Sequence, residues 1–493
     1  MEEIVPLYID GKPARAQSND VYTVLNPKDN QTLVGRHCLA GRADMETAIR
    51  AARAAFDQGP WPRMAIQERA DCLNRFASLI IQNKVPLGTL ESDTSGKLRT
   101  ENIDFDMNGS AEHFTFYANI LFQRPELRFT KEAQFLGRRI TAESLLLHEP
   151  VGVCGLLIPW NSPMMLATWA LGPILILGNT CVLKPMPWSS LGVLELSRLA
   201  REAGIPDGVL NILPARREGA DALVTNKGVD QISFTGSVPT GVAINQANAR
   251  TRFRPPILEL GGKAVAIVLP DAELNLAVQG VARGIFRSQG QSCVACSRAI
   301  VHESIYRKFV DAIVGFTEGL KIGDQKEAST QFGPVINREH FNRVMDHIKR
   351  AKEQGARVLT GADRVNGNGL SAGNYIKPTI FGDVSPTMDV WQNEIFGPVL
   401  CMRSFKTEEE AVQLANSTEF GLSSNVWGND KNATWRLSRK LDVGMVFENC
   451  HFIRDLRGFF GSETRSSGNC FVGGDESLRH YSKRKVICSA YYQ

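Results

Sequence analysis

The chain has 493 residues, of which 43% are hydrophobic and 22% charged, and its formal net charge is +4. This length corresponds to roughly two to four domains, and the composition is typical of a globular protein. The sequence contains no basic block and no basic stripe with interleaved aromatic residues, so nucleic acid is not an expected partner.

The ten cysteines and eight histidines form no metal-binding pattern. The cysteines show neither repeated spacing nor paired clusters of the zinc type, and the histidines include no HExxH pair. We therefore expect no metal site and a reduced, cytoplasmic protein.

The most apolar stretch, residues 164–183, is long enough on paper to cross a membrane. Gly172, Pro173 and Gly178 interrupt it, so we interpret it as a buried helix followed by a buried strand. The N-terminal sequence MEEIVPLYIDGK is acidic and polar, unlike a secretory signal. No membrane association is expected.

Taken in chain order, the sequence first shows helical periodicity over residues 40–120. Polar and apolar residues then alternate within 131–150, which predicts a strand pair or an extended arm. Strands and helices alternate from residue 151 to 236, which predicts a parallel, doubly wound sheet with ligands at the carboxyl ends of its strands. The strands are expected at 151–158, 179–185, 208–214 and 230–236, and the helices at 164–177, 189–203 and 219–224. A second α/β unit begins near ELGGKAVAIVLPD (259–271).

Three polar motifs lie at strand ends or at the boundary between the two units. In FTGSVPTG, Gly236 and Ser237 precede a helix whose backbone amides can bind a phosphate; alternatively, this motif is only a turn. Asn161 in PWNSP either donates to a developing oxyanion or forms a turn between prolines. Glu259 in ELGGK is either a general base in a cleft or a surface carboxylate beside a hinge.

GQSCVACSR (290–298) contains Cys293 and Cys296, each of which is open to three interpretations. A cysteine here is a small core residue, half of a redox pair, or a nucleophile. The redox pair is disfavoured, because such pairs usually follow the first strand of a small domain. A nucleophile would need a lowered pKa and donors for an oxyanion elsewhere in the chain.

The succession of motifs carries more information than any one of them. PWN, KP, FTGS, LELGGK, GQSC and EIFGPV occur in this order, with GPWPRM, EPVGV and FGLSSNV among them. This succession closely resembles the aldehyde dehydrogenase superfamily, from about residue 8 to the mid-450s.

The resemblance implies an α/β fold with a Rossmann-type parallel-sheet cofactor domain, an α/β catalytic domain and a small β oligomerisation arm. The cofactor domain would comprise residues 1–127 and 150–258, and the catalytic domain residues 259–463. Residues 128–149 and 464–493 would form the arm and a C-terminal strand that pairs between subunits. A homodimer or homotetramer is expected.

The resemblance also implies the catalytic roles. Cys293, not Cys296, would attack the aldehyde, and the Asn161 side chain with the Cys293 backbone N–H would hold the oxyanion. Glu259 would activate water to hydrolyse the thioester. A relative that passes the acyl group to coenzyme A typically lacks this carboxylate.

NAD or NADP is the cofactor that the resemblance implies. The residues expected to bind it are Ile158, Trp160, Lys184, Pro187, Gly236, Ser237, Glu394 and Phe396. Relatives that prefer NAD usually have Glu at the Pro187 position, where it accepts from the ribose diol and repels a 2′-phosphate. With Arg216 or Arg217 nearby, we hypothesise that NADP is accepted; alternatively Pro187 only weakens ribose binding and both arginines are solvated.

The C-terminal section departs from the family pattern. Residues 459–474, FFGSETRSSGNCFVGG, replace a glycine-rich motif with several positions changed and one residue inserted. Upstream, FIRDLRGFFG (452–461) resembles the 2-aminomuconate and hydroxymuconate semialdehyde dehydrogenases, which implies that Arg457 holds a substrate carboxylate. A second arginine expected in that subgroup is Thr115 here.

The substrate that these features favour is a semialdehyde with one carboxylate. The residues expected to line its pocket are Phe114, Thr115, Trp160, Ser292, Arg457, Phe459 and Phe460. One alternative is an uncharged aromatic or aliphatic aldehyde, with Arg457 paired to Asp455 or a neighbour. Another is a catalytically weak family member with a binding or structural role.

Overall fold

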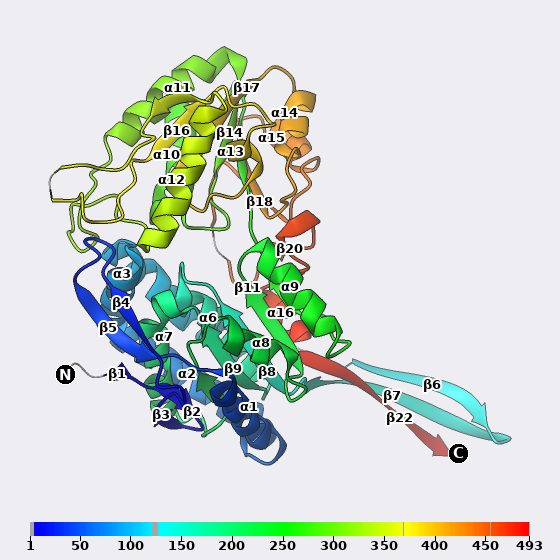
Figure 1. Cartoon of the computed structure of the whole chain (residues 1–493). Helices are drawn as coiled ribbons and strands as arrows, with labels where there is room; N and C mark the ends of the chain where they lie inside the picture. The colour runs from blue at the N-terminus through cyan, green and yellow to red at the C-terminus, as the bar shows by residue number, and fades with distance from the viewer. Residues whose placement is uncertain (1–3, 121–126, 368, 454, 493) are drawn as a thin grey trace.

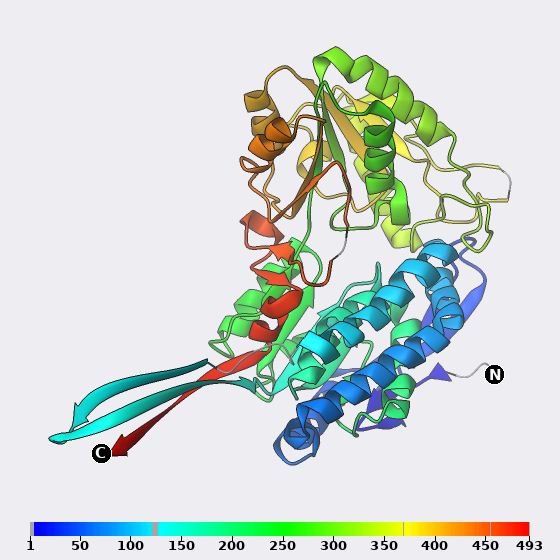
Figure 2. The ribbon, with the colours of Figure 1, turned by 180° about the vertical axis from the view of Figure 1, so that it is seen from behind.

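The computed structural model describes the chain except for residues 1–3, 121–126, 368, 454 and 493. Figure 1 shows two bodies, each built around a sheet with helices on both faces, and a long arm that leaves the lower body. Figure 2 gives the view from behind, where the helices of the N-terminal part cover the lower body. The predicted α/β class is confirmed.

The first sheet lies in the lower body, and five of its strands, from one edge inward, run parallel. In spatial order the strands are β12 (Ile257–Glu259), β11 (Gln231–Thr235), β8 (Val153–Ile158), β9 (Thr180–Pro185), β10 (Leu210–Ile212), β2 (Leu7–Ile9) and β3 (Lys12–Ala14). The predicted strands from 151 to 236 correspond to β8, β9, β10 and β11, and are confirmed.

Alternate residues of β8 enter two different hydrophobic cores, which explains its uninterrupted apolar sequence. Leu156 belongs to a core with α2 (Ile66–Gln82), α5 (Asn108–Ile120), α6 (Pro163–Ile176) and α7 (Ser190–Glu202). Leu157 belongs to the core on the other face, with α1 (Arg42–Asp57), α8 (Arg217–Thr225) and α9 (Val238–Ala249). A strand covered on both faces needs apolar side chains at every position.

The second sheet lies in the upper body and is parallel except for its first strand. In spatial order the strands are β15 (Arg357–Thr360), β16 (Thr379–Gly382), β17 (Val399–Phe405), β14 (Arg298–His302), β13 (Val265–Val268), β18 (Ser423–Trp427) and β19 (Met445–Glu448). One face is covered by α10 (Leu274–Phe286) and α11 (Glu303–Glu318). The other is covered by α12 (Arg338–Glu353), α13 (Asp389–Gln392), α14 (Glu408–Ala415) and α15 (Lys431–Ser438).

The arm is an antiparallel sheet of β6 (Leu127–Phe135), β7 (Arg138–Pro150) and β22 (Ser482–Tyr492). Leu127, Leu146 and Val486 pair side by side across its three strands. Leu127 and Val486 are 50% and 63% exposed, so this row presents apolar side chains to solvent.

The remaining elements are short. They are β1 (Ile4–Val5), β4 (Val21–Leu25), β5 (Leu33–Cys38), α3 (Lys84–Ser95), α4 (Arg99–Glu101), β20 (Phe460–Ser462), β21 (Cys470–Val472), α16 (Gly474–His480) and single turns η1 (Trp61–Arg63), η2 (Asn102–Met107), η4 (Pro187–Ser189), η5 (Arg287–Gly290) and η6 (Arg465–Ser467). β20 and β21 form a hairpin, and α16 packs on the first body, so only β22 of residues 464–493 belongs to the arm sheet. The predicted domain division at 258/259 falls within β12 and stays a prediction.

Within the described part of the chain, no helix combines the length and apolarity needed to span a bilayer.

Candidate active site

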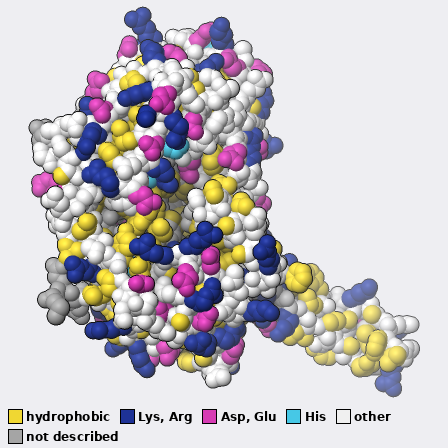
Figure 3. Space-filling view, in the orientation of Figure 1, with side chains coloured by type: hydrophobic (Ala, Val, Ile, Leu, Met, Phe, Trp, Pro, Cys, Tyr) yellow, Lys and Arg dark blue, Asp and Glu magenta, His cyan; other side chains and the backbone are white. Residues whose placement is uncertain are grey.

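A cavity of about 1820 Å³ lies between the two bodies. Figure 3 shows the hollow, with hydrophobic side chains gathered inside and basic side chains along its edge. The walls include most of the residues singled out from the sequence: Ile158, Trp160, Asn161, Lys184, Pro187, Arg216, Arg217, Gly236, Ser237, Glu259, Ser292, Cys293, Glu394, Phe396 and Phe460.

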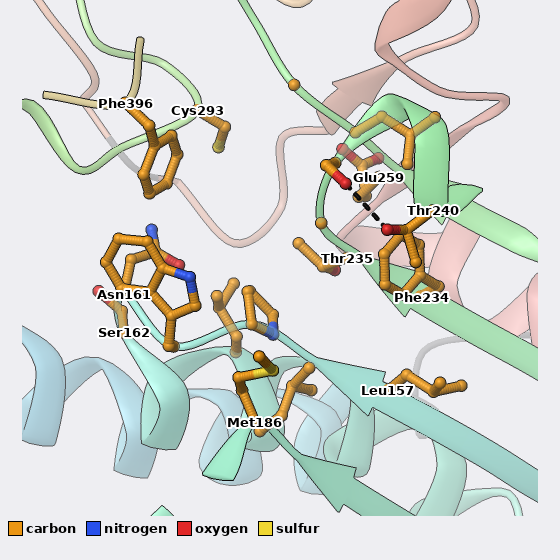
Figure 4. A pocket seen from close by; sticks show the side chains of 18 of the residues that line it. Leu157, Asn161, Ser162, Met186, Phe234, Thr235, Thr240, Glu259, Cys293 and Phe396 are labelled. Carbon is orange, nitrogen blue, oxygen red and sulfur yellow. Dashed lines mark hydrogen bonds between the residues drawn. The ribbon is translucent and has the colours of Figure 1, made fainter. Parts of the chain in front are cut away.

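A strained turn places Cys293 on the cavity wall. Ser288 and Gln289 after α10 have positive φ angles of 50° and 57°, which non-glycine residues rarely adopt. At Gly290, with φ of 71°, a Cβ would lie 2.3 Å from the Gly397 carbonyl oxygen, so no side chain fits there. The turn therefore projects Cys293 toward Asn161, which lies on the facing wall after β8 (Figure 4).

The thiol of Cys293 is held protonated by its surroundings. Burial, together with Glu394 and Glu259, raises its pKa to about 12, while the backbone amides of Cys293 and Val294 oppose that shift. Asn161 Nδ2 donates to the Gln291 carbonyl oxygen at 3.0 Å, which fixes the amide beside this turn.

Glu259 ends β12 and is 6% exposed. Burial raises its pKa well above the usual range for a carboxyl, and its Oε1 accepts a hydrogen bond from Cys470 Sγ at 3.5 Å. Its Oε2 is buried without a hydrogen-bond partner among the described residues. A desolvated carboxyl of this kind is a strong proton acceptor when ionised.

The N-terminus of α9 faces the cavity and suits a phosphate. Ser237, the residue before this helix, bonds Thr240 Oγ1 at 3.0 Å and does not cap the first-turn amides. Lys184 at the end of β9 is buried on the same wall, and burial lowers its pKa to about 8. Helix amides with a nearby lysine match the donor set needed for a dinucleotide.

Glu394 and Phe396 form the opposite wall. Glu394 Oε1 accepts from the Gly262 N–H at 2.9 Å, and burial raises the pKa of Glu394 to about 7. Phe396 has a positive φ of 57°, and its carbonyl oxygen accepts from His340 Nε2 at 2.7 Å. Its ring meets that of Trp160 edge-on at 5.2 Å, so the two rings enclose one end of the cavity.

The chain resembles known proteins along nearly its whole length. The sequence model of the Aldehyde dehydrogenase family matches residues 14–487. The chain belongs to the aldehyde dehydrogenase family.

Individual relatives of this aldehyde dehydrogenase cover nearly its whole length. It is 37% identical to chloroplastic betaine aldehyde dehydrogenase of Atriplex hortensis, with 98% of this chain and 96% of the relative covered. It is 35% identical to aldehyde dehydrogenase family 2 member C4 of Arabidopsis thaliana, with 98% and 94% covered.

Solved structures agree with this assignment. A putative aldehyde dehydrogenase from Burkholderia cenocepacia superposes with a TM-score of 0.94 at 34% identity, covering 98% of this chain and 97% of that one. The NAD-dependent aldehyde dehydrogenase of Sinorhizobium meliloti gives 0.94 at 32% identity, with 99% and 95% covered. The narrower likeness to muconate semialdehyde dehydrogenases stays a prediction.

Four residues expected in the substrate pocket of this aldehyde dehydrogenase lie elsewhere. Phe114 is fully buried and stacks on Phe76 with ring centroids 4.5 Å apart, so it belongs to the core between α2 and α5. Thr115, next along α5, is exposed and does not line the cavity. The structure places both residues away from the cavity, because the helical rotation of α5 directs Phe114 into the core and Thr115 to solvent. Their role in substrate binding stays a prediction.

Arg457 also lies outside the cavity. Its guanidinium is 83% exposed and pairs with Asp455 at 2.8 Å, the arrangement that the sequence offered as the alternative. Phe459, half exposed, is likewise absent from the cavity wall. The structure therefore places both residues outside the cavity wall, and their role in substrate binding stays a prediction.

The structure adds lining residues that the sequence did not single out, among them Phe105, Trp169, Arg283, Arg287, His451 and Phe452. The two arginines had a signal, since they stand four residues apart at the end of the predicted helix before GQSC. The sequence contains no pattern that would identify the aromatic lining residues, because they come from separate elements.

Cys296 does not line the cavity. It is 1% exposed, and its Sγ donates to Asn425 Oδ1 and lies 3.6 Å from His451 Nδ1. Burial raises its pKa to about 12. These contacts fit a packed core thiol.

Proposed function

We propose that this aldehyde dehydrogenase oxidises an aldehyde to a carboxylic acid with NAD or NADP, through covalent attachment to Cys293. The observation that supports this most is the convergence of Cys293, Asn161 and Glu259 on one cavity whose far end suits a dinucleotide. NAD is the cofactor of the relative from Sinorhizobium meliloti.

The first step joins the substrate to the protein. The Cys293 thiol gives up its proton to water, and Sγ forms a bond to the carbonyl carbon while the C=O electron pair moves to the oxygen. The Asn161 amide and the Cys293 N–H stabilise that oxyanion by donating to it. A nicotinamide cofactor held by residues such as Lys184 and Ser237 would supply a hydride acceptor for this carbon, and loss of the hydride would leave a thioester on Cys293.

The second step releases the acid. Glu259 takes a proton from water, the water oxygen bonds to the thioester carbon, and the C–S bond breaks to return the Cys293 thiolate. The buried position of Glu259 serves this step, because desolvation makes its carboxylate a stronger base. The oxidised carbon leaves as a carboxylate.

The test follows reduced-cofactor formation with a panel of aldehydes, with and without coenzyme A. We expect Cys293→Ala to lose activity by on the order of 10³-fold or more, whereas Cys296→Ala stays within a few fold of the wild type. Inactivity of Cys296→Ala together with activity of Cys293→Ala would overturn the assignment. Product formation only with coenzyme A would replace hydrolysis by acyl transfer.

Glu259→Gln separates the two steps. We expect a burst of one equivalent of reduced cofactor followed by turnover slower by about 10²–10⁴-fold, because the thioester accumulates. Mass spectrometry of the quenched protein then detects the acyl group on Cys293. A wild-type protein that binds dinucleotide but oxidises no aldehyde would support the binding or structural alternative.

We also propose that NADP is accepted. Arg42, Arg216, Arg217 and Arg250 line the same cavity as Lys184 and Pro187. Of the carboxylates that also line it, Asp221 pairs with Arg217 at 3.6 Å, and Glu339 acts with Arg216 on Tyr22. A wall with more cations than carboxylates favours a 2′-phosphate.

A further inference from the structure

A chain of aromatic rings runs along the cavity on the Cys293 side. Trp169 and Phe460 lie 4.9 Å apart between ring centroids, Phe460 and Phe452 lie 5.8 Å apart, and Phe452 and Phe105 lie 6.4 Å apart. All four residues line the cavity, although they come from three separate parts of the chain. Such a wall fits an apolar substrate body.

Arg287 lies at the Phe105 end of this aromatic chain. Its guanidinium stacks over the Phe105 ring, with the guanidinium carbon 4.0 Å from the centroid. Its Nε lies 3.5 Å from Glu101 Oε1, so this carboxylate orients the Nε side of the guanidinium. The side chain is 39% exposed and lines the cavity, and no hydrogen bond from its terminal nitrogens is found within the described residues.

Arg283 stands one helical turn before Arg287, in the last turn of α10. It is exposed, lines the same cavity, and has no ion pair with any described residue. Glu101 is engaged by Arg287, and Glu259, which also lines the cavity, is buried. Arg283 therefore adds, one helical turn from Arg287, a positive charge that no carboxylate pairs within the described residues.

We propose that Arg287, assisted by Arg283, holds a carboxylate of the substrate. This inference rests on the proposed function and names its substrate class: aldehydes with an apolar body and an anionic group at the end remote from the carbonyl. A stacked guanidinium presents its two terminal nitrogens as a planar fork, which matches the two oxygens of a carboxylate. Arg287 thereby takes the role that the sequence suggested for Arg457.

The experiment compares 4-carboxybenzaldehyde with its methyl ester, which has no charge and carries one additional methyl group. We expect the wild type to have the higher kcat/KM for the anion. Arg287→Gln should raise KM for the anion about tenfold or more while changing kcat/KM for the ester by less than about threefold. Arg283→Gln should have a smaller effect in the same direction, and Arg287→Lys should recover part of the loss.

Arg457→Gln is the matched control, since Arg457 pairs with Asp455 outside the cavity, and it should leave both substrates unaffected. Three outcomes would overturn the inference. They are an equal loss of kcat/KM for both substrates in Arg287→Gln, a wild-type preference for the ester, and a loss of kcat/KM for the anion alone in Arg457→Gln. Cys293-dependent oxidation of propanal without oxidation of 4-carboxybenzaldehyde would also overturn it and leave the proposed function intact. Failure of the wild type with every aldehyde would instead contradict the proposed function.

Discussion

Cys470 donates its thiol hydrogen to Oε1 of Glu259 across 3.5 Å, and both side chains are buried. Cys470 begins β21, whose hairpin partner β20 brings Gly461 against the same carboxyl oxygen. A Cβ on Gly461 would lie 2.1 Å from Glu259 Oε1. The atypical segment 459–474 therefore forms the wall that holds the candidate general base.

This contact predicts the pH dependence of thioester hydrolysis. Burial raises the pKa of Glu259, whereas the hydrogen bond from Cys470 lowers it. Because only the ionised carboxylate accepts a proton, hydrolysis should rise with pH through this pKa. Cys470→Ala removes the donor, so the pKa of Glu259 should rise further. The rising limb of the plot of hydrolysis rate against pH should then move to higher pH.

Rapid-quench measurement of acyl-enzyme decay against pH provides the check. Cys488→Ala is the matched control, because Cys488 is exposed on the arm. A limb that stays in place in Cys470→Ala, or moves to lower pH, would show that Cys470 does not act on Glu259.

Cofactor preference should respond to charge at the end of β9. Pro187→Glu introduces a carboxylate that can accept from the ribose diol and repel a 2′-phosphate, so the ratio of NADP to NAD affinity should fall by about tenfold or more. Arg216→Gln should weaken NADPH binding more than NADH binding. Equilibrium titration of the cofactor fluorescence measures both; equal changes for the two cofactors would contradict the proposed NADP contact.

A buried ion pair supports the Asn161 loop. Lys97 Nζ donates to Asp106 at 2.6 Å and to Ser162 Oγ at 3.0 Å, and both charged side chains are almost fully buried. Lys97→Met leaves Asp106 without its cation, and we expect about 3–5 kcal/mol lower free energy of unfolding. Denaturant titration measures the loss. Lys97→Met with Asp106→Leu should recover much of it, and a double variant as unstable as the single one would argue against the pair.

Phe114 should affect stability and leave substrate choice unchanged. Phe114→Ala opens a cavity beside Phe76, which predicts a loss of about 3–5 kcal/mol in the free energy of unfolding. The KM for aldehydes should stay unchanged at temperatures where the variant is folded. A selective change in KM would return Phe114 to the substrate pocket.

The arm should mediate self-association. Val486→Lys places a charge in the exposed row formed with Leu127 and Leu146, so the mass from light scattering should fall toward that of one chain. Lys483→Gln on the same strand is a surface control with no apolar contact to lose. An unchanged assembly in Val486→Lys would place the interface elsewhere.

The sequence by itself determined the elements and the order of the polar motifs. The buried strands and helices from 151 to 236 were readable because apolar periodicity reflects burial of one or both faces. Parallel strands place their carboxyl ends at one edge, so residues such as Asn161 and Glu259 were expected to converge although 98 positions separate them.

Tertiary structure alone decided which side chains meet. The sequence could not place Cys470 beside Glu259, since 211 positions separate them and their contact depends on how a hairpin packs on the sheet edge. It also singled out Arg457 and not Arg287, because the packing of an arginine cannot be seen in the sequence. Only packing shows that Arg457 pairs with Asp455 outside the cavity while Arg287 stacks on Phe105 inside it. Local periodicity encodes burial within an element, whereas contacts between elements depend on the arrangement of the whole chain.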